Sequence, residues 1–588
     1  MSNPYEAPLT LMRLAIEQAA RTTGARGLEG YAEVLDDLAE PVLETASRFA
    51  ADVLSPLNSV GDRSPAHCEA QGVVASPGFP QAYRRFCDDG WASLGAPMQH
   101  GGQGLPSLIA VAVSEMWAGA NMAFAMCPEL SVGALEALRV HASQPLQDEF
   151  MPHIASGELA TTMCLTEPQA GSDLSTLRTR AEPDGDAWRL YGRKIYISWG
   201  DHDLTDNILH FVLARTPDAP AGLKGISLFV VPKKIANADG KLADNDIHAV
   251  SVEHKMGIRA SPTCVMALGE HAGAKGWLIG RLNDGLGCMF TIMNHMRIGV
   301  GVHSLGLADR ALQLARHHAR ERLQGRDAAG AQRPIIEHTD VRRMLLTMKS
   351  LTHAARCLVY TAAATVDVAH AAKSEATRAA ALRRADLLTP VVKAWGSDTG
   401  LEVASLGVQV HGGTGYVDDA EISQVYRDAR IGSIFEGTNY IQAQDLLGRK
   451  IIRDRGVALG ELLTDIEAAA RQLPVERVPI LAGLQTALLA NCVTMRDTTA
   501  SVIEKSATDP QLVGAIAYDF LNWLGVLIGG WQWALCAQAV SQTDDPQAGS
   551  LLELAAFYAA RILPRTRTAR AAVSSGSVPV TSIPITDL

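Results

Sequence analysis

The sequence predicts a mainly α-helical protein that contains one small antiparallel β domain. Ala- and Leu-rich stretches with helical spacing fill residues 1–158 and return after Gly287. Between them lie short runs rich in β-branched and aromatic residues, and turn signals rather than helical periods separate these runs. The expected order is therefore helices, strands, helices and a further helical block.

The length of the chain predicts several structural units. At roughly 150 residues per domain, 588 residues correspond to about three or four domains. The changes in pattern give four segments: an N-terminal helical domain at 1–158, a middle β domain at 159–280, a second helical domain at 281–455 and an extra C-terminal helical domain at 456–588.

The middle and second helical domains carry the clearest local signals. Strand-like runs follow one another at residues 188–197, 207–214, 226–231 and 264–268, and a Pro-Asp-Gly turn precedes the first. Beyond Gly287, apolar residues from Leu305 to Ala319 recur at steps of three and four, as on one face of a helix. A polar stretch at 373–378 predicts an exposed link between long helices.

Composition excludes several classes of protein. A net charge of -11 and a pI of about 5.9 argue against a nucleic-acid surface, although they allow a local basic pocket for an anionic cofactor. The nine cysteines are scattered and contain no CxxC, so we expect a reduced cytoplasmic compartment and no metal site. No basic and apolar leader opens the chain, so no signal peptide is expected.

One apolar segment approaches the length of a membrane span. It begins at Phe520 and reads FLNWLGVLIGGWQWALCAQA. Asn522, Gln532, Gln538 and a pair of glycines interrupt it, and no Lys or Arg flanks it closely. We therefore expect a buried helix or helix pair, and no membrane contact.

A single carboxylate, Glu436, stands in the apolar stretch GSIFEGTNYIQ at residues 432–442. It could pair with Arg427 or Arg430, or lie near a helix N-terminus, where the dipole favours negative charge. Alternatively, it could be a general base whose proton affinity is raised by an apolar pocket, with Gly437 allowing close approach. The spacing alone leaves both interpretations open.

Three further motifs are weak singly. MCLTEPQAGSD, at residues 163–173, is either an ordinary turn or a loop that offers backbone N–H groups and hydroxyls to an anion or a polar ring edge. KIYISWG, from Lys194, alternates aromatic and hydroxyl side chains, as a half-buried strand would. VQVHGGTGY, at 408–416, is glycine-rich, but it is not a GxGxxG after a strand, which excludes a dinucleotide-binding fold.

Taken together and in order, these motifs resemble the acyl-CoA dehydrogenase family over roughly residues 90–450. The shared pattern is TEPxAGSD, a K-aromatic-I-S strand, QVxGGxGY, a YRDARI block and FEGTxxIQ. The resemblance implies a helical domain, a β-barrel domain and a four-helix-bundle domain, with FAD bound where the last two meet. It also implies a homodimer or homotetramer.

The resemblance also implies a reaction, in which Glu436 is the catalytic base. It would remove a proton from the carbon next to the thioester carbonyl of an acyl-CoA, while the neighbouring carbon gives a hydride to flavin N5. Hydrogen bonds to the carbonyl oxygen, from the Glu436 backbone N–H and a flavin ribityl hydroxyl, would stabilise the developing enolate.

The remaining site residues follow from the same motifs. The resemblance implies cofactor contacts at Met163, Leu165 and Thr166 (ring edge), Gly171, Ser172 (pyrophosphate), Tyr196 and Ser198 (ring face and N5), Thr438 and Gln442 (beside the base), and Arg322, Gln409 and Gly413 (the ADP half, from a neighbouring subunit). It implies substrate contacts at Ser172, Arg297 and Gly437. For Arg297, an intrahelical salt bridge is the alternative.

Two departures and one extension refine the resemblance. The chain reads RLQGR from Arg322 where the family often has an aromatic cofactor contact, so that contact is absent here. Some members place the base beside the arginine that matches Arg297; here that neighbour is Met296, which favours Glu436. The extra C-terminal block resembles a long bacterial subgroup that includes 3-methylmercaptopropionyl-CoA and broad-chain dehydrogenases.

The expected activity is FAD-dependent α,β-dehydrogenation of an acyl-CoA to a trans-2-enoyl-CoA, with electron-transfer flavoprotein as acceptor. 3-Methylmercaptopropionyl-CoA and short- or medium-chain acyl-CoAs both remain open, because hydrophobic pockets separate such chains by only about 1–3 kcal/mol per group. An acyl-CoA oxidase and a non-catalytic acyl-CoA-binding protein are the alternatives. The C-terminal block could cover the substrate entrance, touch a membrane or form a dimer interface, which we favour.

Overall fold

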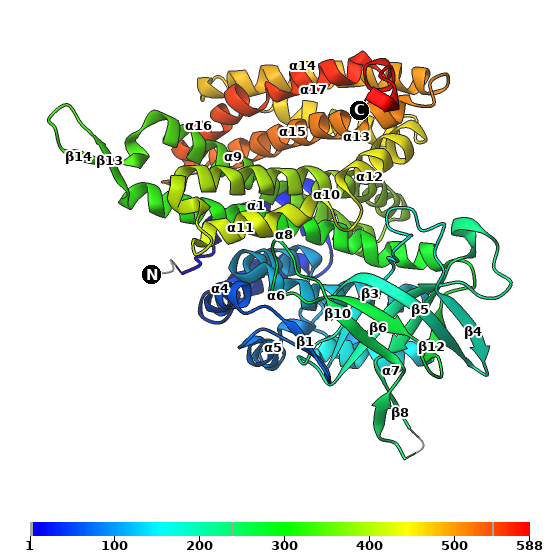
Figure 1. Cartoon of the computed structure of the whole chain (residues 1–588). Helices are drawn as coiled ribbons and strands as arrows, with labels where there is room; N and C mark the ends of the chain where they lie inside the picture. The colour runs from blue at the N-terminus through cyan, green and yellow to red at the C-terminus, as the bar shows by residue number, and fades with distance from the viewer. Residues whose placement is uncertain (1–3, 238, 544–545, 588) are drawn as a thin grey trace. The chain divides into compact units, whose positions relative to one another are not determined.

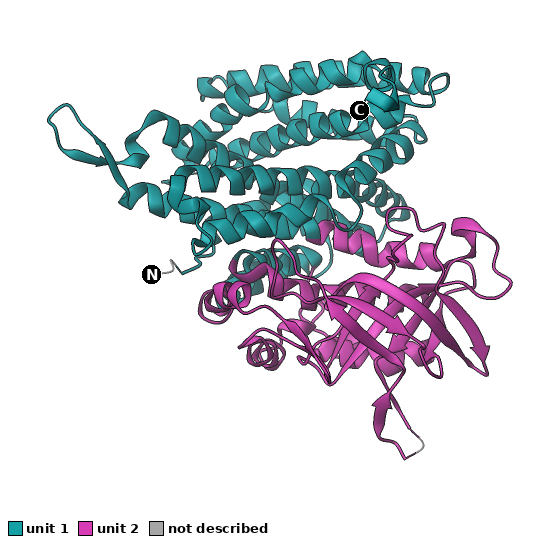
Figure 2. Cartoon of the chain, viewed as in Figure 1, with its two compact units in different colours: residues 1–47, 107–119, 300–588 teal, residues 48–106, 120–299 magenta. Residues whose placement is uncertain are grey.

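The computed structural model describes residues 4–237, 239–543 and 546–587. The chain divides into two compact units (Figure 2): unit 1 comprises residues 1–47, 107–119 and 300–588, and unit 2 comprises residues 48–106 and 120–299. Two long helices, α6 (Ser107–His141) and α8 (Gly285–Glu321), contribute residues to both units. The four domain bounds expected from the sequence stay a prediction.

Unit 2 is built on an eight-stranded sheet with the order β10-β11-β5-β12-β7-β6-β3 and with β4 added beside β5 (Figure 1). Neighbouring strands are antiparallel except β3 and β6, which are parallel. The strands are β3 (Leu159–Cys164), β4 (Arg180–Asp184), β5 (Ala187–Ser198), β6 (Asn207–Ala214), β7 (Ser227–Pro232), β10 (Ile247–Val252), β11 (Thr263–Leu268) and β12 (Ala274–Ile279).

The four strand-like runs of the sequence are confirmed as β5, β6, β7 and β11. Strands β6 and β7 are buried along almost their whole length, and Val212 and Phe229 lie in the core of the sheet. Such continuous burial explains why these two strands are apolar runs rather than alternating ones. The small β domain is therefore confirmed.

Unit 2 also contains a hairpin that the sequence pattern missed. Its strands β1 (His67–Glu69) and β2 (Gly72–Val74) follow helix α4 (Ser55–Arg63) and precede α5 (Phe79–Asp88) in the chain, and they contact β10; a further helix of the unit is α7 (Gln144–Ser156). The turn of the hairpin ends at Gly72, whose φ of 129° suits glycine. A second short hairpin pairs β8 (Lys234–Ala236) with β9 (Leu242–Asp244).

Unit 1 is almost entirely helical, apart from a hairpin of β13 (Leu323–Arg326) and β14 (Gln332–Pro334). Besides the first part of α6 and the last part of α8, its helices are α1 (Leu9–Thr23), α2 (Tyr31–Glu33), most of α3 (Ala39–Phe49), α9 (Thr339–Ala371), α10 (Glu375–His411), α11 (Glu421–Ala429), α12 (Asn439–Gln444), α13 (Val457–Arg471), α14 (Ala482–Ser506), α15 (Leu512–Val540), α16 (Ala548–Phe557), α17 (Arg565–Ser575) and α18 (Val578–Thr581).

The link between α9 and α10 falls in the polar stretch expected from the sequence. Helix α9 ends at Ala371, and Ser374 caps α10 by accepting a hydrogen bond from the N–H of Thr377 at 3.4 Å. The two helices pack against each other along their length, and α1 packs against α9 and α15 within the same unit (Figure 1). The helical block after residue 456 is thus part of unit 1.

The apolar segment from Phe520 lies within α15, at the centre of that block. Trp523, Trp531 and Trp533 are fully buried, and Gln532 accepts a hydrogen bond from Gln18 of α1 at 2.8 Å. Among the described helices, α6 and α15 are long and apolar enough to cross a membrane, and 89% and 67% of their most apolar windows are buried inside the protein. Burial in the protein accounts for the composition of α15.

Glycines let α15 approach its neighbours closely. A Cβ added at Gly525 would collide with Trp395 of α10, and one added at Gly529 would collide with Tyr558. Helices that carry small residues four positions apart can pack backbone against side chain in this way. The extra C-terminal block is therefore joined to α10 by a fitted interface.

We expect Gly525→Ala to destabilise unit 1 by about 1–3 kcal/mol, because overpacking at Trp395 outweighs the better helix propensity of alanine. Thermal unfolding of the purified variant measures this. Gly483→Ala in α14 is the matched control, because a Cβ there meets nothing within 4 Å. Equal melting temperatures for the two variants would contradict the fitted interface.

Candidate active site

A buried ion pair in unit 2 joins the loop after β3 to strand β5. Lys194 is fully buried and donates from Nζ to Glu167 Oε1 at 2.9 Å and to the carbonyl oxygens of Leu165 at 3.0 Å and Leu213 at 2.8 Å. The N–H of Ile195 donates to the carbonyl of Thr166 at 2.9 Å. The motifs TEPQAGSD and KIYIS are therefore one structural feature, fixed by these contacts.

The charges of this pair are set by opposing effects. Burial disfavours the ionised Glu167, but Lys194, together with hydrogen bonds from Thr179 and the N–H of Arg178, lowers its pKa to about 2. Burial also lowers the pKa of Lys194, against the attraction of the same carboxylate. Sequence reasoning did not assign either residue, although a lysine on the buried face of a strand is the signal that could have found them.

The predicted ring-edge and pyrophosphate residues lie on β3 and the loop that follows it. Met163 is half-buried and lies opposite Phe211 of β6, and Leu165 and Thr166 are half-buried at the start of the loop. Gly171 and Ser172 are exposed at the far side of the loop. The ion pair thus holds the first three beside β5 and leaves the last two open to solvent.

Tyr196 and Ser198 lie at the end of β5, where the pairing with β11 is irregular. The partner of Ile197 is Cys264, but the partner of Lys194 is Met266, so β5 carries one extra residue. Tyr196 lies in this bulge with a φ of 59°, and the residue is 62% exposed. Bulges redirect side chains in this way. Ser198 is half-buried opposite Thr263.

Arg297, the predicted substrate arginine, is buried on α8. Its Nη1 donates to Asn294 Oδ1 at 3.1 Å, and its guanidinium lies 5.7 Å from the ring centre of Phe290. Both partners are on the same helix, one turn and two turns before it. Both contacts are therefore intrahelical, and both are to neutral side chains.

Glu436 lies in unit 1, in the short loop between α11 and α12. It is half-buried, and its φ of 54° places it in the left-handed region that non-glycine residues rarely adopt. Gly437 follows with a φ of 81°. A pair of left-handed residues is costly for Glu436, by about 1–3 kcal/mol, and such conformations cluster at functional sites.

Contacts from α12 hold this conformation. Gln442 is fully buried and donates from Nε2 to the carbonyl oxygen of Glu436 at 3.2 Å. Thr438 caps α12 by accepting from the N–H of Ile441 at 3.3 Å. Before the loop, a Cβ at Gly432 would lie 3.1 Å from Ser304 of α8, so the chain there is tightly packed. The Glu436 backbone is therefore fixed from both sides.

Arg427 and Arg430, which lie near Glu436 in the sequence, each contact another side chain of this segment. Arg427 lies 3.5 Å from Asp418, and Arg430 donates to Ser433 Oγ at 3.1 Å. The predicted ADP-side residues Arg322, Gln409 and Gly413 are all exposed in the same part of unit 1.

Two stacked histidines bring that part of unit 1 together. The rings of His318, at the end of α8, and His411, at the end of α10, are 4.4 Å apart and inclined by 23°. Arg322 follows His318 by one turn, and Gln409 and Gly413 flank His411. The three predicted residues therefore lie around one stack.

Some of the predicted cofactor residues have open space around them, and one has a polar atom without a partner. Of the described residues, Gln442 has a buried Oε1 without a hydrogen-bond partner, and such an atom is costly unless something else pairs with it. A Cβ added at Gly171 or Gly413 would meet nothing within 4 Å. In unit 2, the exposed ring of Tyr196 and the open backbone at Gly171 suit a flat ring and a phosphate. In unit 1, Gln442 Oε1 and the open backbone at Gly413 suit polar groups of a flavin nucleotide.

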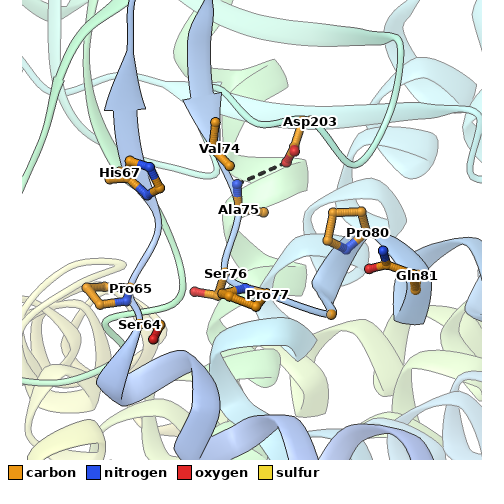
Figure 3. Close-up of a pocket in the computed structure, with 11 residues that line it drawn as sticks. Ser64, Pro65, His67, Val74, Ala75, Ser76, Pro77, Pro80, Gln81 and Asp203 are labelled. Atoms are coloured by element: carbon orange, nitrogen blue, oxygen red, sulfur yellow. Dashed lines mark hydrogen bonds between the residues drawn. The ribbon is translucent and has the colours of Figure 1, made fainter.

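Two other kinds of site can be compared with this one. No group of three or more His, Cys, Asp or Glu side chains that could hold a metal ion occurs among the described residues. A hollow of about 440 Å³ in unit 2 lies between the β1–β2 hairpin and α5, and Figure 3 shows the N–H of Ala75 donating to Asp203 at its wall, at 2.9 Å. None of the predicted site residues lines it.

Comparison with known proteins identifies the class. Models of the acyl-CoA dehydrogenase N-terminal, middle and C-terminal domains match residues 38–158, 162–270 and 283–452, and a model described as acetyl-CoA dehydrogenase C-terminal like matches residues 459–584. The chain belongs to the acyl-CoA dehydrogenase family. The resemblance and fold class expected from the motifs are confirmed.

Individual members of this family are similar to the chain over most of its length. The chain is 41% identical to the 3-methylmercaptopropionyl-CoA dehydrogenase of Ruegeria pomeroyi, over 91% of each protein. It is 32% identical to the broad-specificity linear acyl-CoA dehydrogenase FadE5 of Mycobacterium tuberculosis, over 94% of each. In fold it is similar to an acyl-CoA dehydrogenase of Bacillus anthracis complexed with FAD, with a TM-score of 0.72, 21% identity, and coverage of 92% of this chain and 88% of that one.

Proposed function

We propose that the protein is an FAD-dependent dehydrogenase that converts an acyl-CoA to its trans-2-enoyl-CoA, with Glu436 as the base. The observation that carries this is the left-handed Glu436, which Gln442 holds by its carbonyl oxygen at 3.2 Å in a chain of the acyl-CoA dehydrogenase family. A costly backbone conformation that a buried side chain maintains is what a positioned catalytic group requires.

Each group of residues has a separate task in this proposal. The Glu436 carboxylate takes the proton from the carbon next to the thioester carbonyl, and its backbone N–H stabilises the negative charge that develops on the carbonyl oxygen. FAD supplies the hydride acceptor for the neighbouring carbon. Thr166, Tyr196 and Ser198 hold the ring, and Gly171 leaves the backbone open to a phosphate.

The acyl group is proposed from the relatives. The Ruegeria pomeroyi relative suggests 3-methylmercaptopropionyl-CoA, whereas the FadE5 relative suggests linear chains of several lengths. A thioether sulfur is close in size to a methylene, so a single pocket can accept both types. We propose 3-methylmercaptopropionyl-CoA together with short- or medium-chain acyl-CoAs as the substrate class.

Three further proposals concern the electron acceptor, the assembly and the cellular location of the enzyme. We propose electron-transfer flavoprotein as the acceptor and a homodimer or homotetramer as the assembly, with Arg322, Gln409 and Gly413 serving the ADP half of the neighbouring subunit's cofactor. All nine cysteines are free thiols, which supports a reducing cytoplasmic location.

The visible spectrum of the purified protein tests the function. We expect a yellow protein that an acyl-CoA bleaches under anaerobic conditions, with the fastest of butyryl- to palmitoyl-CoA and 3-methylmercaptopropionyl-CoA naming the substrate class. A yellow protein that no thioester bleaches, or a colourless one, would favour the non-catalytic alternative. Stoichiometric hydrogen peroxide in air would favour an acyl-CoA oxidase.

We expect Ser198→Ala to reduce the rate of flavin reduction by about tenfold and to weaken FAD retention, because one hydrogen bond to the ring is lost. Stopped-flow bleaching and flavin content after gel filtration measure the two effects. Ser175→Ala in the exposed loop is the control, since its hydroxyl donates to Asp173 at 2.8 Å. Native kinetics in Ser198→Ala would remove this residue from the site.

A further inference from the structure

Helix α12 begins three residues after Glu436, and its first side chain is fully engaged. Asn439 is buried, and its Oδ1 accepts from Lys393 Nζ at 2.9 Å. Its Nδ2 donates to Asp398 Oδ1 at 2.8 Å and to the carbonyl of Ala394 at 3.1 Å. The hydroxyl of Ser397 also lies 3.0 Å from Nδ2. All four partners lie on α10, so α10 fixes the start of α12 through one amide group.

The second oxygen of Asp398 leads to the C-terminal block. Tyr518 of α15 donates from its hydroxyl to Asp398 Oδ2 at 2.7 Å. Burial, followed by this hydrogen bond, raises the pKa of Tyr518 to about 12, so the hydroxyl stays protonated and remains a donor at neutral pH. Tyr518, which is 120 residues away in the sequence, therefore orients the Asp398 carboxylate that accepts the hydrogen bond from Asn439.

A direct contact joins α12 to α15 at the next residue, Tyr440. Tyr440 donates from its hydroxyl to the carbonyl of Gly514 in α15 at 3.2 Å, and Gln444 donates to that hydroxyl at 2.9 Å. A Cβ at Gly514 would lie 3.2 Å from the same hydroxyl. Helices α12 and α15 are in contact, so the C-terminal block holds α12 directly at Tyr440 and, through Asp398 of α10, at Asn439 (Figure 1).

The position of α12 in turn sets the position of Glu436. The hydrogen bond of Gln442 to the Glu436 carbonyl and the cap supplied by Thr438 both belong to α12. A left-handed residue relaxes to an ordinary conformation when its surroundings loosen. Any rotation of α12 would therefore move the carboxylate and the backbone N–H of Glu436 together.

We propose that Tyr518 and Asp398 are positioning residues for Glu436, and that the C-terminal block thereby completes the site through α15. The inference rests on the proposed function of Glu436 as the base. It gives the block a role in the reaction within one chain, separate from any dimer interface. Neither residue touches the reacting atoms, since both act through Asn439 and α12.

Tyr518→Phe tests this with the loss of one hydroxyl. We expect the limiting rate of anaerobic flavin reduction by acyl-CoA to fall about tenfold while KM stays within about twofold, because misplacement of a catalytic group lowers the rate rather than binding. Asp398→Asn should have a similar effect. The double variant should be no slower than the slower single variant, because both changes break one chain of contacts.

Glu402→Gln is the matched control. Glu402 and Arg565 form a two-pronged ion pair with both distances at 2.7 Å, which also ties α10 to the C-terminal block, but through α17 rather than α12. We expect this variant to keep the native rate. A Tyr518→Phe variant with the native rate, or a Glu402→Gln variant as slow as Tyr518→Phe, would overturn the positioning role.

Hydrogen exchange gives a readout that does not depend on activity. We expect the amides of residues 436–442 to exchange at least about tenfold faster in Tyr518→Phe than in Glu402→Gln, because α12 loses a fixed point. Equal exchange in the two variants would overturn the inference. If no acyl-CoA bleaches the native flavin, the proposed function fails, and the exchange experiment still decides whether Tyr518 holds this segment.

Discussion

Glu436→Gln is expected to leave a yellow protein that binds acyl-CoA and no longer bleaches. Glutamine keeps the size and the backbone contacts of Glu436, including the Gln442 hydrogen bond to its carbonyl, but its amide cannot accept the α-proton. General bases contribute about 10²–10⁴-fold to rate, so flavin reduction should slow by about that factor. Anaerobic stopped-flow spectroscopy with the best substrate measures it.

The control for this experiment is the same chemical change elsewhere in unit 1. Glu461→Gln removes an exposed ion pair with Arg383 at 3.1 Å, which is worth little, and should bleach at the native rate. Flavin content and the melting temperature should be native in both variants. A Glu436→Gln protein that bleaches within tenfold of the native rate would show that the base lies elsewhere.

The parts of the fold that the sequence predicted are those that local pattern encodes. Strands β6 and β7 are apolar runs because both faces are buried, and the break between α9 and α10 is a polar stretch with a capping serine. The hairpin of β1 and β2 was missed, because each strand has only three residues, which is too short for an alternating pattern to be detected.

The candidate site was predicted as motifs, but the interactions that hold the motifs were not. Glu167 and Lys194 are 27 residues apart and pair only when β5 lies beside the loop after β3. Asp398 and Tyr518 are 120 residues apart, and neither lies in a motif. Such hydrogen bonds form only when distant segments come together in the folded chain, and the spacing of apolar residues gives no information about that. The left-handed Tyr196 depends likewise on register against β11.

Lys194→Met is expected to destabilise unit 2 by about 3–5 kcal/mol and to abolish FAD retention, because methionine fills the space of the lysine stem but leaves the Glu167 carboxylate buried without its cation. The carbonyls of Leu165 and Leu213 lose their donor at the same time. The loop that carries Thr166 would then separate from β5. Thermal unfolding and flavin content after gel filtration measure the two losses.

The neighbouring residue provides the control, and a second substitution provides a rescue. Arg193→Met removes a charge from the exposed face of β5, where its carboxylate partner Glu270 is 3.8 Å away, and should cost less than about 1 kcal/mol.

Adding Glu167→Gln to Lys194→Met removes the unpaired charge, so the double variant should be more stable than Lys194→Met alone. A double variant less stable than the single one would mean that the Glu167 carboxylate contributes through the N–H groups of Arg178 and Thr179 rather than through Lys194. In that case the lysine would act mainly as a donor to the two carbonyls, and the loop would be held by hydrogen bonds instead of by the ion pair.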